Sequence, residues 1–286
     1  MKIAVSSYSF SQYINKGLLN QFSCIQKAKD MGFEAIEFVD ILPHDGSSRE
    51  EYAVRLREEC ERVGLPISNY TFGADFLNCE DLDAEIQRVC DEIDMAELLG
   101  ARSVRHDASI GYPAGRYQGF DKVLPTLAYA CRKVTVYAAS KGIRTMVENH
   151  GFFAQDSDRV EKLMLAVDHP NFGWLVDMGN FTCVDEDPVT AVGRAAPYAF
   201  YAHAKDFHIK TAMEPDPGEC FFRSRGGNYL RGAIIGHGVV PVRQCLFALK
   251  RAGYDGYVAI EFEGLEDCLL GIRIGLDNLK RYLSEI

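Results

Sequence analysis

Four ionisable residues interrupt apolar segments in the second half of the chain. They lie in MVENHG, WLVDMGN, YAHAKD and AIEFEG, where each stands near the end of a run typical of a buried strand. The residues are Glu148, Asp177, His203 and Glu261. A carboxylate at the end of a buried strand costs free energy unless it is paired or coordinated. Three carboxylates and one imidazole form an oxygen-rich ligand set, which predicts a site for one divalent metal ion: Mn²⁺ first, with Mg²⁺, Co²⁺ or Zn²⁺ open.

Such ligands need a scaffold that brings strand ends together, and the periodicity of the chain predicts one. Short apolar runs alternate with longer amphipathic segments along the 286 residues. The predicted strands are 3–8, 35–39, 67–72, 103–106, 145–149, 173–178, 199–204 and 257–262. The predicted helices are 19–31, 49–63, 82–99, 120–140, 159–167, 189–196, 241–252 and 266–283.

Glycines mark the ends of several predicted helices, just before the next strand. They are Gly32, Gly64, Gly100, Gly142 and Gly253, and glycine accepts the left-handed conformation that closes a helix. Strict strand–helix alternation implies a parallel sheet covered by helices. Eight such units predict one α/β domain over residues 1–286, a closed (β/α)8 TIM barrel. No GxGxxG follows the first strand, which weakens a dinucleotide-binding alternative.

One connection is unusually long. Residues 206–239 separate the seventh predicted strand from its helix and contain several arginines and glycines. In a barrel this segment lies on the face that carries the active site. We expect a long loop that covers the substrate, although a decorative insertion is also open.

With these residues in view, the chain resembles the xylose-isomerase-like TIM barrel superfamily, which includes sugar phosphate isomerases and epimerases, ketose 3-epimerases and inosose dehydratases. The resemblance spans essentially the whole chain. It is most specific at VENHG, LVDMGN, YAHAKD and GHGVVPVRQCLFALKRAGYDGYVAIEFEG. It implies that Glu148, Asp177, His203 and Glu261 bind the metal, and that Glu148 and Glu261 also act as acid and base. The implied activity is that of a metal-dependent sugar isomerase or epimerase, which abstracts a proton next to the carbonyl of a ketose, keto-sugar or sugar phosphate.

The chain departs from the ketose epimerase pattern at one position. Those enzymes usually carry a histidine three residues after the sixth-strand aspartate, where this chain has Asn180. His150, two residues after Glu148, falls on the same side of an extended segment as that ligand and is a catalytic candidate. It resembles the base of barrels such as the C-glycoside deglycosidases. The alternative activity is therefore a lyase or dehydratase acting on a 3-keto-sugar, keto-glycoside or inosose.

Other polar residues, near strand ends or in the long connection 206–239, are candidate substrate contacts. They are Glu37, His106, Asn180, Lys205, Arg231 and His237. For each of them a structural pairing is the competing interpretation. Trp174, in the sixth strand, is expected to belong to the core.

Composition restricts the remaining possibilities. The formal net charge of −10 argues against nucleic acid as a partner, and therefore against the abasic-site endonucleases that share this barrel. The complete ligand set argues against a non-catalytic sugar-binding subunit. The nine scattered cysteines are expected to be buried thiols, and neither a secretory leader nor a membrane segment is predicted. We expect a cytoplasmic enzyme with a small carbohydrate substrate, with a homo-oligomer left open.

Overall fold

Eight parallel strands close into a barrel in the computed structural model, which describes residues 1–111 and 119–286. Around the barrel the order is β1-β11-β7-β6-β5-β4-β3-β2, and neighbouring strands are parallel. The strands are β1 (Lys2–Ser6), β2 (Ala35–Val39), β3 (Ile67–Phe72), β4 (Ser103–His106), β5 (Arg144–Glu148), β6 (Phe172–Asp177), β7 (Ala199–Ala204) and β11 (Tyr257–Ile260). The predicted (β/α)8 barrel is confirmed.

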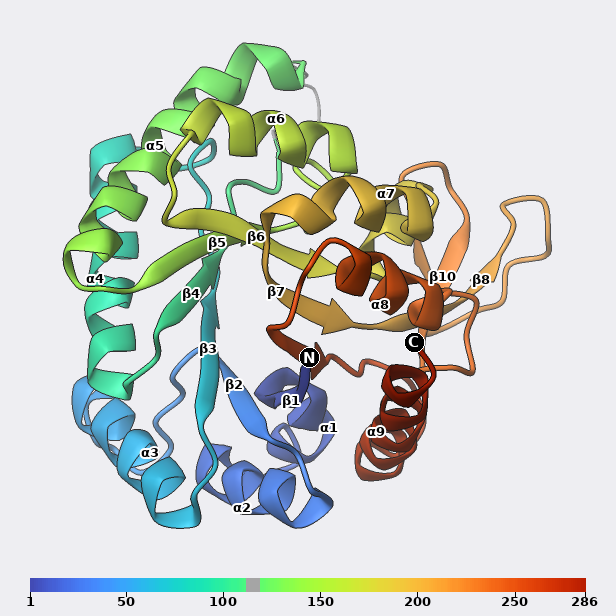
Figure 1. Ribbon diagram of the computed structural model, residues 1–286, viewed down its shortest axis with the longest axis horizontal. Helices are drawn as coiled ribbons and strands as arrows, with labels where there is room; N and C mark the ends of the chain where they lie inside the picture. Colours follow the sequence, from blue (N-terminus) through green and yellow to red (C-terminus); the bar gives the residue numbers. More distant parts are fainter. Residues whose placement is uncertain (112–118) are drawn as a thin grey trace.

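Helices surround these strands (Figure 1). They are α2 (Gln21–Met31), α3 (Arg49–Val63), α4 (Leu82–Leu99), α5 (Phe120–Ser140), α6 (Ser157–Val167), α7 (Pro188–Ala195), α8 (Val242–Arg251) and α9 (Cys268–Ser284). Shorter pieces are α1 (Ser11–Ile14) and the 3-10 helices η1 (Ser7–Phe10), η2 (Asn180–Val184) and η3 (Ala196–Tyr198). The glycines predicted to end helices all have positive φ, as that role requires: Gly32, Gly64, Gly100, Gly142 and Gly253.

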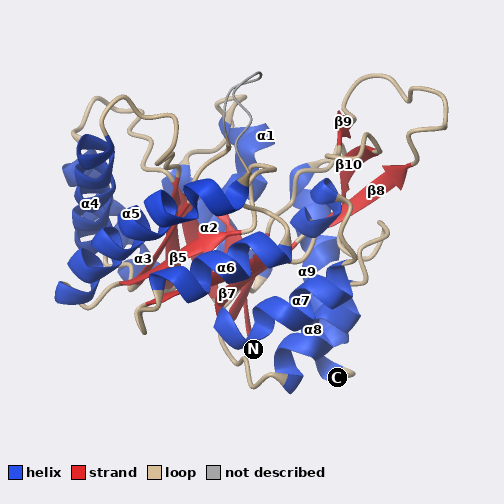
Figure 2. Ribbon diagram, turned by 90° about the horizontal axis from the view of Figure 1, so that it is seen from above, coloured by secondary structure: helices blue, strands red, loops and turns tan. Residues whose placement is uncertain are grey.

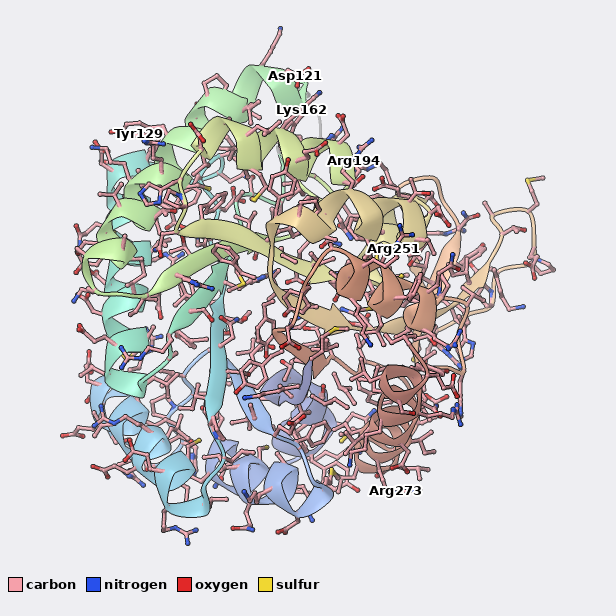
Figure 3. The ribbon with its side chains drawn as sticks, viewed as in Figure 1. Asp121, Tyr129, Lys162, Arg194, Arg251 and Arg273 are labelled. Atoms are coloured by element: carbon pink, nitrogen blue, oxygen red, sulfur yellow. The ribbon has the colours of Figure 1, made fainter. Side chains whose placement is uncertain are left out.

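The outer surface of the helices carries the charged side chains, as Figure 3 shows for Arg194, Arg251 and Arg273. Lys162 of α6 reaches Asp121 of α5 at 3.1 Å, an exposed ion pair of the kind that contributes about 0–1 kcal/mol. Among the described residues, none of the helices has the length and apolar character needed to cross a membrane.

Four strands end earlier than predicted: β1, β5, β6 and β11. The ends of β1 and β11 are linked through the segment that follows β1. β1 stops at Ser6 because the chain turns into η1. Within η1, the Ser9 hydroxyl donates to the carbonyl of Ile260 at 3.0 Å and accepts from the backbone N–H of Phe262 at 2.9 Å. This side chain takes the place of a strand neighbour at the end of β11, so Glu261 lies just past that strand.

The predicted long connection after β7 is present, and part of it is folded into a small sheet. The insertion, residues 206–239, contains a three-stranded antiparallel sheet made of β8 (Asp206–Lys210), β9 (Phe222–Arg223) and β10 (Tyr229–Ala233). Two buried side chains, Phe207 and Leu230, give this sheet an apolar side. In Figure 2 it stands at the opposite end of the view from the two chain termini.

The core has two layers. The larger layer lies between strands and helices and includes Trp174, which is fully buried as expected and donates its indole N–H to Asn149 Oδ1 at 3.1 Å. The smaller layer fills the barrel interior and consists of Ala4, Ala35, Met146, Leu175, Tyr201 and Ala259. The interior is therefore packed, as in other barrels of this type. This packed layer is the floor of the space at the carboxyl ends of the strands.

The cysteines are all free thiols. Seven are buried, as expected, and Cys79 is partly buried. Cys220 is exposed, so the expectation of burial was wrong there, because this residue lies in the connection between β8 and β9.

Candidate metal centre

The four predicted ligands converge above the barrel floor. In a strand, residues two apart point to the same side. Met146, Leu175, Tyr201 and Ala259 fill the barrel interior, and two positions after each of them stand Glu148, Asp177, His203 and Glu261. One ligand atom from each of the four lies within 4.8 Å of all the others. The strand period thus turns four separate sequence positions into one cluster.

A hydrogen bond fixes which nitrogen of His203 faces this cluster. Nε2 lies 2.7 Å from Oε2 of Glu37, whose other oxygen accepts from Asn69 and Thr71. Nδ1 therefore faces inward, 3.5 Å from Glu148 Oε1. An outer carboxylate that orients a histidine in this way is typical of metal sites in proteins.

Two buried atoms of the cluster lack a hydrogen-bond partner among the described residues. They are Nδ1 of His203 and Oδ2 of Asp177, which lie 3.8 Å apart. Buried polar groups are almost always satisfied. A divalent ion bound by the cluster would give both of these atoms a partner. The residues present therefore fit the predicted ion.

The charge balance also favours a cation. Burial, opposed by Lys205 and reinforced by Glu148 and Glu261, raises the pKa of Asp177 to about 8. Burial is the largest cause of this rise, and repulsion from the two neighbouring carboxylates adds to it. Binding a divalent ion would relieve that repulsion and keep Asp177 ionised.

The outer oxygens of the two glutamates are each held by a buried cation. Oε2 of Glu148 lies 2.6 Å from the guanidinium of Arg105. Oε2 of Glu261 lies 2.7 Å from Nζ of Lys205, which is also 3.2 Å from Glu263. Burial acts to raise both glutamate pKa values, yet these cations hold the pKa of Glu148 and of Glu261 below its ordinary value. The outer oxygen of each glutamate therefore already has a cationic partner.

His150 lies close enough to the cluster for its charge to act on Glu148. Its Nδ1 lies 2.9 Å from Oδ1 of Asp107, and its side chain is 47% exposed. Burial disfavours the charged ring, but the hydrogen bond and charge of Asp107 outweigh it and raise the pKa of His150. Because Nδ1 is occupied, Nε2 is the nitrogen that remains for a substrate.

Asn180 belongs to the same constellation. Its side-chain amide donates to Glu148 Oε1 at 3.1 Å, and its backbone N–H donates to Asp177 Oδ1 at 2.8 Å. Asn180 begins η2, so the turn after β6 brings it back over the cluster. It supports two ligands in the structure, and a contact with substrate stays a prediction.

Two of the predicted substrate contacts have structural partners instead. Glu37 is fully buried and occupied by His203, Asn69 and Thr71, as described above. His106 is fully buried on the helix side of β4, with its ring stacked on Phe72. Burial lowers the pKa of His106 to about 4, which keeps the ring neutral. The alternation of β4 explains this, because Arg105 faces the interior and its neighbour faces outward.

The last two predicted substrate contacts, Arg231 and His237, lie in the insertion. Arg231, on β10, reaches Glu266 at 3.9 Å and packs over the ring of Phe221. His237 is exposed in a turn whose flanking backbone N–H groups bind the carboxylate of Asp206. Neither side chain makes a hydrogen bond or ion pair to the four ligands within the described residues.

Arg105 was not among the predicted site residues. It links the ligand Glu148 to Asp107, the partner of His150. It contacts Glu148 and also Asp107, at 2.9 Å from its Oδ1. A signal was available: an arginine in the middle of an otherwise buried strand needs a charged partner, just as the four strand-end residues do.

Comparison with known proteins identifies the family. Residues 25–282 match the family described as "Xylose isomerase-like TIM barrel". The chain is 25% identical over 274 residues to the rhizopine catabolism protein MocC of Rhizobium meliloti, covering 90% of this chain and 80% of that protein. It is 25% identical over 138 residues to inosose dehydratase of Lacticaseibacillus casei, a match that spans 48% of this chain and 46% of that enzyme.

Solved structures share the fold at lower identity. The IOLI protein with a bound zinc atom superposes with a TM-score of 0.77 at 14% identity, over 100% of this chain and 99% of that one. D-allulose 3-epimerase from Methylomonas sp. superposes with a TM-score of 0.73 at 16% identity, over 99% of this chain and 98% of that one. The fold and the buried cluster define a class, the metal-dependent sugar enzymes built on this barrel. The protein belongs to the xylose isomerase-like TIM barrel family.

Proposed function

We propose that this protein is a metal-dependent lyase that eliminates water or an alcohol from a keto-sugar, keto-glycoside or inosose. The observation that carries the proposal is the pairing described above: both glutamate outer oxygens are held by cations, whereas His150 is half-exposed and paired with Asp107. This asymmetry supports one base and one acid rather than two glutamates exchanging protons. Glu148, Asp177, His203 and Glu261 would hold the ion, for which Mn²⁺ is proposed, and such an ion polarises a substrate carbonyl.

The residues divide the proton transfers between them. Nε2 of His150 takes the proton from the carbon next to the carbonyl, which is C2 in a 3-keto-glycoside. The C1=C2 double bond forms as the bond from C1 to the leaving oxygen breaks, and the electron pair departs on that oxygen. The ammonium of Lys205 gives a proton to that oxygen. Glu261 and Glu263 outweigh burial and hold the pKa of Lys205 well above its ordinary value, so the side chain is charged beforehand. An ion that takes up the charge of Glu261 would lower that pKa again and favour proton donation.

Isomerisation or epimerisation is the second candidate, and it begins with the same proton abstraction. His150 alone could return the proton to a neighbouring carbon, since single-base isomerisation needs no second carboxylate. Inosose dehydratase among the relatives supports elimination, and the epimerase among the similar folds supports this alternative.

The test separates the two outcomes. The protein, loaded with Mn²⁺, is incubated with methyl 3-keto-β-glucoside and with an inosose in deuterated water, and the products are analysed by NMR and mass spectrometry. Elimination predicts release of methanol or water and an unsaturated product. An isomer that carries deuterium, with no loss of methanol or water, would contradict elimination and support the second candidate. His150→Asn should stop either reaction, whereas the matched control His169→Asn, in the loop between α6 and β6, should not.

A further inference from the structure

Two exposed apolar side chains border His150. Ile110, in the loop after β4, is 62% exposed, and Phe152, in the loop after β5, is 42% exposed. The two loops touch, because a Cβ placed on Gly151 would lie 3.1 Å from Cγ2 of Ile110. Single exposed apolar residues are ordinary on a protein surface. A pair in two loops that touch at Gly151, the residue after the proposed base, is a more specific arrangement.

Phe152 is held at this place at a conformational cost. Its φ of 65° lies in the left-handed region, which an aromatic residue rarely adopts. Its backbone N–H donates to the side chain of Gln155, and its carbonyl accepts from the guanidinium of Arg225. Arg225 is itself anchored on Asp156 at 2.9 Å, and Gln155 donates to the carbonyl of Asn180 at 2.6 Å.

These contacts tie the turn to both the insertion and the metal centre. Arg225 comes from the insertion, and Asn180 supports two metal ligands. The surroundings therefore fix the backbone of Phe152 while leaving its ring in solvent. A strained residue that its neighbours over-determine is a common feature of ligand-binding loops.

We propose that Ile110 and Phe152 form a subsite for an aromatic group carried by the substrate, so that the substrate class is an aryl keto-glycoside. The inference rests on the proposed function, because it places this group next to the base. In a 3-keto-glycoside the aglycone is attached to C1, one bond from the C2 whose proton His150 takes. A ring bound beside His150 therefore belongs to the leaving group. Aromatic and aliphatic side chains bind such a ring by stacking and burial of apolar area.

Binding rather than turnover tests this subsite. Phenyl and methyl 3-keto-β-glucoside are titrated by calorimetry into the Mn²⁺-loaded His150→Asn protein, in which no turnover consumes them. We expect the phenyl compound to bind about tenfold more tightly, the size of one good aromatic contact. Adding Phe152→Asn should remove this preference, because asparagine tolerates the left-handed conformation and leaves the turn intact. Phe152→Tyr should retain it.

A matched control uses another exposed aromatic residue. Phe247 on α8 is 46% exposed, so Phe247→Asn should leave the preference unchanged. Equal affinity for the two compounds, no binding of either, or a preference that survives Phe152→Asn would overturn the subsite. If Phe152→Asn instead changes the sedimentation of the protein and leaves the preference intact, that result would assign Ile110 and Phe152 to a contact between proteins and would also overturn the subsite. Failure of the proposed function looks different: the wild-type protein would release neither phenol nor methanol, whatever the binding preference.

Discussion

Glu148 and Glu261 stand at the two ends of the ligand set, and their surroundings differ. Glu148, on β5, is paired with Arg105, which continues to Asp107 and so to His150. Glu261, after β11, is paired with Lys205. A guanidinium does not release a proton in proteins, whereas an ammonium can. In the proposed reaction, the β5 side therefore supplies the proton acceptor and the β11 side supplies the proton donor.

The largest expected effect comes from loss of the metal ion, on which both sides of the site depend. Glu148→Gln and Glu261→Gln each take a charged ligand from the cluster, and each should reduce turnover of a keto-glycoside to the background rate. The cause is loss of the ion, so bound Mn²⁺ should fall in parallel in elemental analysis. Full turnover by either variant would contradict the shared ligand role.

The next effect breaks the acceptor side. His150→Asn keeps the size and polarity of the side chain but cannot take a proton, so kcat should fall by about 10²–10⁴-fold. The ligands are untouched, so Mn²⁺ binding should be unchanged. Steady-state kinetics beside a metal titration makes this distinction, and a kcat near that of the wild type would remove His150 from the account.

Breaking the donor side should cost less, and the loss should depend on the leaving group. Lys205→Met removes the proposed proton donor and should lower kcat by about 10²-fold for methyl 3-keto-β-glucoside. The loss should be smaller for the phenyl compound, because phenolate departs without much help. If both compounds lose the same factor, Lys205 acts by supporting Glu261 rather than by donating a proton.

A smaller effect concerns the orientation of His203. Glu37→Gln weakens the acceptor on its Nε2 and should reduce metal affinity by about 10–100-fold. At saturating Mn²⁺ the activity should largely return. Unchanged metal affinity would show that Glu37 has no influence on the ligand.

The smallest effect is a shift in pH dependence. The base must be neutral, so kcat/KM falls as pH decreases through the pKa of His150, which Asp107 holds above its ordinary value. Asp107→Asn removes that influence, and the acidic limb of the profile should move to lower pH. A limb that stays in place or moves upward would contradict the pairing.

The sequence predicted the elements and the meeting of the four ionisable residues, because both follow short-range rules. Strand alternation and helix-ending glycines located the eight units, and strand-end charges located Glu148 and Asp177. What it could not provide depended on long-range contacts. Ser9 shortens β11 from a position some 250 residues away, and the insertion becomes a sheet only because β10 returns to β8.

For the site, too, local sequence rules predicted some features and missed those that depend on spatial contacts. Residue type and position pointed to His150. The same reasoning also pointed to His106, which faces aromatic rings, and passed over Arg105, which faces the cluster. The two residues are consecutive in β4, so their side chains point to opposite sides of the strand. Pattern alone therefore proposed the wrong member of that pair as the polar contact.

The most direct test of the central claim is the metal content of the wild-type protein and of Asp177→Asn after loading with Mn²⁺ and removal of free ion. Asp177 makes no ion pair with Arg105 or Lys205 among the described contacts, so its loss reports on the ion itself. We expect about one divalent ion per chain in the wild type and a clear loss in the variant, with the folded state confirmed by circular dichroism. No bound ion in the wild type, or equal amounts in both proteins, would contradict it.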